Sequence, residues 1–290
     1  MSGTQKGPYY PILDLIKAIL TIGIVFRHAE LVGLEGQSVA YDFLNHGMML
    51  LTSACVPIFF VLAGYLYFRN VPERPDARFF WQKTRNRFSS LLVPYLIANA
   101  IAFVLYWLAH HYSADMVSGY FGDNWTKPLF IFWTGPINMS LWFIRDLIIC
   151  CFVAPLIYLL VRYTRIWGVI ALGAVWIFWQ GSAWYNVWFA LGAWAAVCQG
   201  PAVDRLLRKI PAQVPAGVSG WCFFVYLYHY VPSLAFKKLF ATLFKPDSFL
   251  TLSATYWATA LIVLAMMTGL YIGLRSAVPR LTRVLVGGKR

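Results

Sequence analysis

The N-terminal apolar segment, residues 11–32, carries ionisable side chains whose spacing could support chemistry. It reads PILDLIKAILTIGIVFRHAELV and contains Asp14, Lys17, Arg27 and His28. If this segment is one α-helix, Lys17 and His28 are about three turns and about 16 Å apart along the axis, and both side chains leave the same face. Asp14 falls within about 40° of His28 on that face, and Thr21 lies between Lys17 and His28. The segment therefore predicts a helix with one polar stripe.

This polar stripe has a functional interpretation and a structural one. Each ionisable group near the centre of a bilayer costs about 2.5 to 3.5 kcal/mol, so such groups usually serve a substrate or proton pathway. In the structural interpretation, Lys17 extends its side chain to the membrane surface or pairs with Asp14 one turn away. His28 is then an ordinary interfacial residue. The segment alone leaves both interpretations open.

Two later apolar segments carry further polar residues. Arg145 and Asp146 are adjacent in LWFIRDLIIC, and His229 lies in FFVYLYHYV. Adjacent helical residues point about 100° apart, so Arg145 and Asp146 cannot both face lipid at low cost, and ion pairs with other helices are the structural alternative. For His229 the alternative is a packing histidine with satisfied hydrogen bonds. All three residues are candidates for a functional site.

The composition indicates the class of protein that carries these residues. Of the 290 residues, 60% are hydrophobic and only 12% are charged, which is more apolar surface than one soluble core can bury. We expect an all-α fold, a polytopic transmembrane helical bundle of about eight to ten spans. The apolar segments that fit this expectation are residues 11–32, 46–68, 89–109, 140–161, 166–180, 184–199, 216–236 and 252–274.

The distribution of basic residues predicts the orientation. With a cytoplasmic N-terminus, seventeen of the 24 Lys and Arg side chains fall in cytoplasmic segments, most densely in a basic loop at residues 69–88. Few fall at outer positions, which include the loop at 110–139 and Lys237. This bias follows the positive-inside rule and explains the net charge of +13 without nucleic acid as a partner.

We therefore expect both termini to be cytoplasmic and the whole chain, residues 1–290, to form one membrane-embedded domain. The chain is expected to cross its membrane several times, with the lipid bilayer as its constant partner. The sequence leaves a homo-oligomer open, because oligomeric state has no signature in these patterns.

Nothing in the sequence indicates metal chemistry. Its five cysteines fall in apolar runs, without the paired spacing of a zinc site or a disulfide framework. The sequence also lacks a glycine-rich phosphate loop, a paired-histidine zinc motif and a Gly-x-Ser-x-Gly turn. We expect no metal, so the chemistry has to come from the His, Lys, Arg and Asp side chains.

Five phrases, taken in order, resemble the acyltransferase 3 family of integral membrane acyltransferases, in particular short members similar to envelope sugar O-acetyltransferases. Lys17 and His28 match the family signature of a basic residue, ten intervening residues and a histidine. Asp14 holds the usual acidic position three residues earlier, which makes it a candidate catalytic residue as well. The other phrases are CVPIFFVLAGYLY, LWFIRDLIIC, WFALGAWAA and FFVYLYHYV, and the resemblance covers about residues 10–235.

Two features depart from the family pattern. The basic segment before the third apolar helix commonly reads Arg-x-x-Arg ahead of Leu-Leu-x-Pro. Here Arg87 keeps the first arginine, but Ser90 replaces the second, and Lys83 and Arg85 are the expected substitutes. In addition, Lys17 stands where many relatives have arginine, so a point charge replaces a planar guanidinium.

The resemblance implies transfer of an acyl group, with acetyl as the expected group, from cytoplasmic acetyl-CoA or another acyl-CoA. The implied acceptor is a hydroxyl of an envelope glycan or lipid-linked sugar. The phosphates of CoA are expected to bind Lys83, Arg85 and Arg87 through charge-assisted hydrogen bonds. The pantetheine arm is then expected to pass Lys17 and present the thioester to His28.

For the catalytic step, His28 is the expected general base on the acceptor hydroxyl. Arg145 or His229 is the candidate donor to the oxyanion, and Asp146 or Glu30 is the candidate acid that orients His28. A two-step route through an acyl-histidine stays open.

A small-solute or lipid transporter is the competing class, with Asp14, Lys17 and His28 as an intramembrane relay. Such transporters more often show internal repeats, and this sequence has none. A catalytically silent relative that senses or scaffolds is a third interpretation, which only an activity assay addresses.

Overall fold

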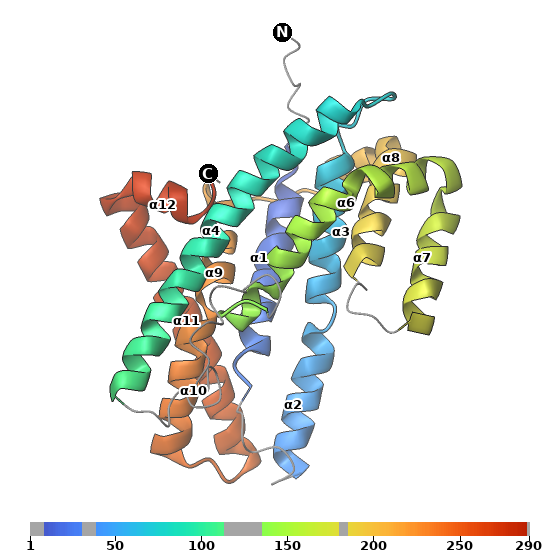
Figure 1. The fold of residues 1–290 in the computed structure, drawn as a ribbon. Coiled ribbons are helices and arrows are strands. Elements are labelled where there is room, and N and C mark those ends of the chain that lie inside the picture. The colour runs from blue at the N-terminus through green and yellow to red at the C-terminus, as the bar shows by residue number, and fades with distance from the viewer. Residues whose placement is uncertain (1–8, 31–38, 113–134, 180–184, 289–290) are drawn as a thin grey trace. The chain divides into compact units, whose positions relative to one another are not determined.

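The computed structural model describes residues 9–30, 39–112, 135–179 and 185–288. In these residues the regular elements are helices and no β-strand occurs, so the predicted all-α class is confirmed for this part of the chain (Figure 1). The elements, in chain order, are α1 (Pro11–Arg27), α2 (Val39–Thr52), α3 (Cys55–Phe68), α4 (Ala77–Tyr112), the 3₁₀ turn η3 (Met139–Leu141), α6 (Trp142–Thr164), α7 (Ile166–Trp179), α8 (Tyr185–Lys209), α9 (Val218–Tyr228), α10 (Tyr230–Phe244), α11 (Phe249–Ala277) and α12 (Pro279–Leu285).

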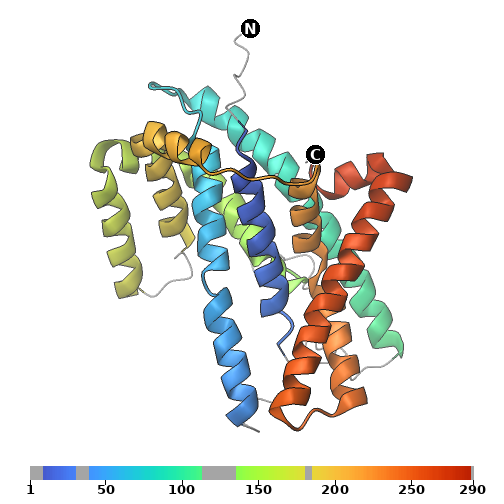
Figure 2. The same cartoon turned by 180° about the vertical axis from the view of Figure 1, so that it is seen from behind.

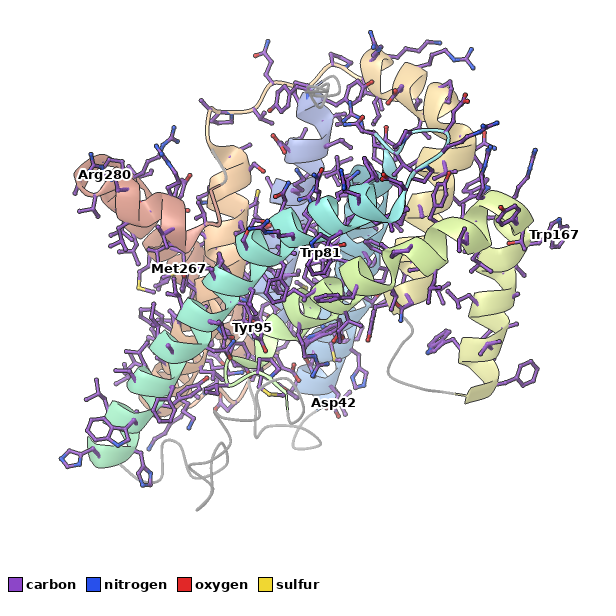
Figure 3. The ribbon with its side chains drawn as sticks, turned by 45° about the horizontal axis from the view of Figure 1, so that its top comes forward. Asp42, Trp81, Tyr95, Trp167, Met267 and Arg280 are labelled. Atoms are coloured by element: carbon purple, nitrogen blue, oxygen red, sulfur yellow. The ribbon has the colours of Figure 1, made fainter. Side chains whose placement is uncertain are left out.

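Among the described residues, four helical stretches are long and apolar enough to cross a membrane. They are Val39–Phe68, which joins α2 and α3, Ala77–His111, Met139–Thr164 and Phe249–Ala277. Apolar side chains on the helices are often exposed, as Figure 3 shows for Trp167 near the start of α7, which is 73% exposed. Exposed apolar surface of this kind suits contact with lipid. The number of spans and the cytoplasmic placement of both termini stay predictions.

The third helix begins earlier than the sequence predicted. Helix α4 starts at Ala77 and not at residue 89, so residues 77–88 of the expected basic loop are helical. Asp76 explains this start, because its side-chain oxygen accepts a hydrogen bond of 2.7 Å from the backbone N–H of Phe79. An aspartate in this position satisfies one of the unpaired N–H groups of a first helical turn.

The expected span at 216–236 is two helices, α9 and α10, with a break at His229. Pro232, the third residue of α10, explains the break. It has no N–H for the carbonyl of Tyr228, and its ring crowds that carbonyl. Pro57 holds the same position in α3 and explains why α3 is separated from α2.

The chain forms two compact units. Unit 1 draws on the described residues of the ranges Met1–Leu20, Ala54–Phe88 and Asp146–Val218. Unit 2 draws on Thr21–Ser53, Ser89–Arg145 and Ser219–Arg290. Helices α1, α4 and α6 therefore contribute residues to both units, and α9 has its first residue in unit 1 and the others in unit 2.

In unit 1, α3 and α8 lie side by side (Figure 1 and Figure 2) because glycines leave no side chains between them. A Cβ atom on Gly64 of α3 would lie 2.2 Å from the carbonyl oxygen of Phe189. A Cβ atom on Gly192 of α8 would lie 2.1 Å from the carbonyl oxygen of Val61. The two backbones are thus in direct contact at two points, which is the small-residue packing of membrane helices.

We expect Gly192→Ala to lower the free energy of unfolding by about 1–3 kcal/mol, the usual cost of overpacking a close contact. The added methyl group would overlap the backbone of Val61, which cannot move aside without separating the helices. Gly200→Ala is the matched control, because Gly200 lies in the same helix and nothing lies within 4 Å of its Cβ position. Thermal unfolding in detergent measures both variants. Equal melting temperatures for Gly192→Ala and the wild type would contradict the contact.

In unit 2, α10 and α11 form a hairpin (Figure 2). Lys245 adopts a left-handed conformation at the end of α10, with φ 41°. Ser248 caps α11 through reciprocal hydrogen bonds with Thr251. The hydroxyl of Tyr256 on α11 donates to the backbone carbonyl of Phe26. This bond holds the C-terminal end of α1 against α11.

Candidate active site

The rings of His28 and His229 lie together in unit 2. Their centroids are 5.3 Å apart with planes tilted by 44°, and the ring of Tyr230 meets the His28 ring edge-on at a centroid distance of 5.1 Å. His28 directly follows α1, and its backbone N–H still bonds to the carbonyls of Ile24 and Val25. The structure therefore brings together two of the predicted site residues, which come from opposite ends of the chain.

The backbone fixes the orientation of His229. Its side chain is fully buried, and its Nδ1 lies 2.9 Å from the carbonyl oxygen of Val225 and 3.0 Å from that of Tyr226. A carbonyl oxygen only accepts hydrogen bonds, so Nδ1 carries the proton and Nε2 of the neutral ring is an acceptor. In the part of the chain that the structure describes, Nε2 has no hydrogen-bond partner. A buried acceptor without a partner costs about 1–3 kcal/mol, which a bound hydroxyl would recover.

This tautomer narrows the chemistry that His229 can perform. As a neutral ring, His229 accepts a hydrogen bond at Nε2, and it donates one there only when the ring is doubly protonated, so its role as oxyanion donor stays a prediction. Arg145, the other candidate, is half-buried in unit 2, with its guanidinium beside Gly135. Its adjacent residue Asp146 is 3% exposed and belongs to unit 1. The oxyanion role of Arg145 and the orienting role of Asp146 stay predictions.

A buried amide network supports the break between α9 and α10. Nδ2 of Asn138 donates to the carbonyl oxygen of Leu227 over 3.0 Å, at the end of α9. Oδ1 of Asn99 on α4 accepts the backbone N–H groups of Ile137, at 2.8 Å, and of Asn138, at 3.2 Å. Asn99 and Asn138 are almost fully buried. Because buried amides with satisfied hydrogen bonds rigidify their surroundings, this network holds the chain that carries His229.

In unit 1, on the first half of α1, Lys17 pairs with Asp14. Nζ of Lys17 lies 2.8 Å from Oδ1 of Asp14, and the hydroxyl of Tyr9 donates to Oδ2 over 2.8 Å. Partial burial, together with this bond to Asp14, raises the pKa of Tyr9. The ion pair is the structural alternative described for Lys17, while a role toward an acyl donor stays a prediction.

Helical geometry keeps Lys17, Thr21 and His28 on one face of α1. Thr21 is fully buried, and its hydroxyl has no hydrogen-bond partner among the described residues. The predicted polar stripe of this helix is therefore present, and its middle member is enclosed in protein.

The basic start of α4 presents two of its three candidate residues on one face in unit 1. Lys83 and Arg87 are four residues apart and half-buried, whereas Arg85 is exposed, as the helical period requires. Nζ of Lys83 lies 5.1 Å from the ring centroid of Tyr67 and 5.2 Å from that of Phe79, within the range of a cation–π interaction. Arg87 also acts electrostatically on Lys83. The structure thus separates Arg85 from the other two.

Thr84 anchors this face of α4. Its buried hydroxyl lies 3.0 Å from the hydroxyl of Tyr67 on α3 and donates to the carbonyl oxygen of Cys151 on α6 over 3.0 Å. These bonds fix the start of α4 within unit 1. Lys83 and Arg87 therefore extend from a part of α4 that the hydrogen bonds of Thr84 hold in place.

Several polar residues of unit 2 were not among the predicted site residues. Lys237 was counted among the outer positions, but it lies in α10, is only 8% exposed and acts electrostatically on His28. Asn99, Asn138 and Ser233 are buried as well. Each of them is a polar residue in or beside an apolar run, so the criterion that selected His229 could have found them too.

The fold and the site define a class of protein. It is a helical protein with segments long and apolar enough to cross a membrane, in which the rings of His28 and His229 are in contact. Within the described residues, no group of three His, Cys, Asp or Glu side chains could hold a metal ion. A family model described as an acyltransferase domain matches residues 10–277. The chain belongs to this family, acyltransferase 3, which confirms the predicted resemblance, and the family together with the apolar helices indicates a multi-pass membrane transferase.

One relative is the succinoglycan biosynthesis protein ExoH of Rhizobium meliloti strain 1021. It is 30% identical to this chain over 177 residues, which cover 53% of this chain and 44% of ExoH. The matched region thus spans less than half the length of that relative. No solved structure matches the chain.

Proposed function

We propose that this protein is an integral membrane O-acyltransferase of the bacterial inner membrane. It transfers an acyl group, acetyl in the simplest case, from cytoplasmic acyl-CoA to a hydroxyl of an envelope glycan or lipid-linked sugar. Membership of the family supports acyl transfer, and the similarity to a succinoglycan biosynthesis protein supports a polysaccharide or its precursor as acceptor. The observation that carries the proposal is the contact between the rings of His28 and His229.

In the proposed reaction, His28 is the general base. Its neutral ring takes the proton of the acceptor hydroxyl while the hydroxyl oxygen attacks the thioester carbonyl. The C–S bond then breaks, the ester is released, and the CoA thiolate takes the proton from His28. A base of this kind contributes about 10²- to 10⁴-fold to the rate.

His229 is proposed to orient His28. Its Nε2 is an acceptor whose direction is set by the two carbonyl bonds at Nδ1. An N–H of His28 that donates to this atom leaves the other ring nitrogen of His28 to act as base, which is how a second group sets the tautomer in a catalytic triad. A neutral imidazole thus takes the role for which an acid was expected.

The Lys83–Arg87 face of α4 is the proposed site for the phosphates of CoA. Two half-buried cations beside the anchored Thr84 suit charge-assisted hydrogen bonds to phosphate oxygens. Arg85 is left out of this site because it is exposed on the other side of the helix. Lys17 is proposed to contact the same donor.

Purified protein in lipid nanodiscs tests the proposal. We expect saturable binding of radiolabelled acetyl-CoA, and release of CoA when a glycan acceptor is added. Envelope glycans from cells with the protein should be heavier by one acetyl group than glycans from cells without it. Absence of acetyl-CoA binding together with identical glycans would contradict the proposal and favour the transporter interpretation.

A further inference from the structure

Helix α10 buries a stripe of polar side chains that the proposed reaction does not fully use. His229, Ser233 and Lys237 are spaced four residues apart and are 0%, 1% and 8% exposed. Residues with this spacing lie one above the other on the same side of a helix. We call them the α10 stripe. One end of the stripe is the ring of His229, which contacts the ring of His28.

Lys237 is the unusual member of the α10 stripe. Lysine is among the residues that are least often buried, and a charge within a membrane helix usually marks a substrate pathway. The adjacent Lys238 is exposed, which is the ordinary position for a lysine. A buried ammonium group attracts an anion far more strongly than an exposed one, because the surroundings are less polarisable than water.

Among the described residues, Lys237 and Arg27 both act electrostatically on His28. The carboxylate of Glu30, which follows two residues later, accepts a hydrogen bond of 3.2 Å from Asn45. Lys237 therefore contributes positive charge near the ring of His28.

The position of Lys237 suits a part of the acceptor other than the reacting hydroxyl. It lies eight positions after His229, which is about 12 Å along the axis. The bond from the N–H of Ser233 to the carbonyl of His229 shows that the helical turn is continuous there. Side chains lean toward the N-terminus of their helix, so a long side chain at position 237 is expected to extend toward the end of α10 that follows His229.

We infer that the α10 stripe binds the acceptor, and that Lys237 binds an anionic group on it, a carboxylate or a phosphate carried by the sugar. The inference rests on the proposed function and specifies its acceptor class. Nε2 of His229, which is buried without a hydrogen-bond partner in the described chain, accepts from the acceptor or from His28 at the reacting end. Lys237 fixes the other end of the same sugar.

Acceptor kinetics in nanodiscs test this inference. The probes are methyl glucoside, which is neutral, methyl glucuronide, which carries a carboxylate, and glucose 1-phosphate, with acetyl-CoA as donor. We expect the wild type to use one of the anionic sugars with a kcat/KM about 10- to 100-fold above that of methyl glucoside, the gain of one charged hydrogen bond. The preferred anionic sugar then distinguishes a carboxylate from a phosphate.

Lys237→Met should remove that preference through a higher KM for the anionic sugar, while the affinity for acetyl-CoA stays unchanged. Lys237→Arg, which keeps the charge, should retain most of it. Lys238→Met is the matched control and should behave as the wild type, because it removes the same charge from the adjacent exposed position.

Several outcomes would overturn the inference and leave the proposed function in place. They are a wild type without preference for an anionic sugar, a wild type that binds acetyl-CoA but uses none of the three probes, and a Lys237→Met variant that loses all activities equally. The same loss in Lys238→Met would overturn it as well. A wild type that neither binds acetyl-CoA nor releases CoA contradicts the proposed function itself, and this inference falls with it.

Discussion

Replacing His28 with alanine is expected to lower kcat for acyl transfer by about 10²- to 10⁴-fold, the usual contribution of a general base. Affinity for acetyl-CoA should stay close to that of the wild type, because the proposed phosphate-binding residues Lys83 and Arg87 lie on α4. Initial rates of CoA release and equilibrium binding of radiolabelled acetyl-CoA, measured on one preparation, separate the two effects.

His46→Ala is the matched control for this prediction. His46 lies in the same unit, is exposed on α2, and its Nδ1 lies 2.7 Å from the carbonyl oxygen of Asp42. Its removal should leave kcat unchanged. Near-normal transfer by His28→Ala would remove the catalytic assignment. Radiolabel that attaches covalently to the wild type in the absence of acceptor, but not to His28→Ala, would favour the acyl-histidine route.

The second large effect is expected at the donor site. Arg87→Ala should raise the KM for acetyl-CoA by about 10- to 100-fold, because one charged hydrogen bond to phosphate is lost. The kcat at saturating acetyl-CoA should change little, since Arg87 binds the same phosphates before and during the reaction. Because surface charge is screened, raising the salt concentration should weaken donor binding in the wild type more than in the variant.

Arg85→Ala supplies the comparison for Arg87→Ala. Both substitutions remove one guanidinium from the same helix, two residues apart, but Arg85 is exposed on the other side of α4. We expect a KM for acetyl-CoA close to that of the wild type. Equal increases for the two variants would show that only the total charge of this helix matters, and the phosphate site would have to be placed elsewhere.

The helical class could be predicted from the sequence because a chain in lipid has to satisfy its backbone hydrogen bonds internally. The ends of the helices were harder to predict, because local capping decides them. Asp76 starts α4 at Ala77 by a single side-chain bond, within the basic stretch that the sequence predicted to be a loop. Pro232 ends α9 before His229. A proline early in a helix does not by itself reveal at which residue the preceding helix ends.

The candidate site was predictable where it depends on one helix and not where it depends on packing. The helical period alone puts Lys17 and His28 on one face, and it separates Arg85 from Arg87 once that segment is known to be helical. The contact between His28 and His229 depends on how the end of α1 packs against the break before α10. No local pattern carries that information.

Direct backbone contact between α3 and α8 limits which movements are available to unit 1. The carbonyls of Phe189 and Val61 occupy the places where side chains would stand at Gly64 and Gly192. Sliding one helix along the other would drive Cα atoms against carbonyl oxygens, with no flexible side chain to absorb the shift. If substrates enter and products leave by motion of this unit, α3 and α8 travel together as one rigid body, and the hinges lie outside this pair.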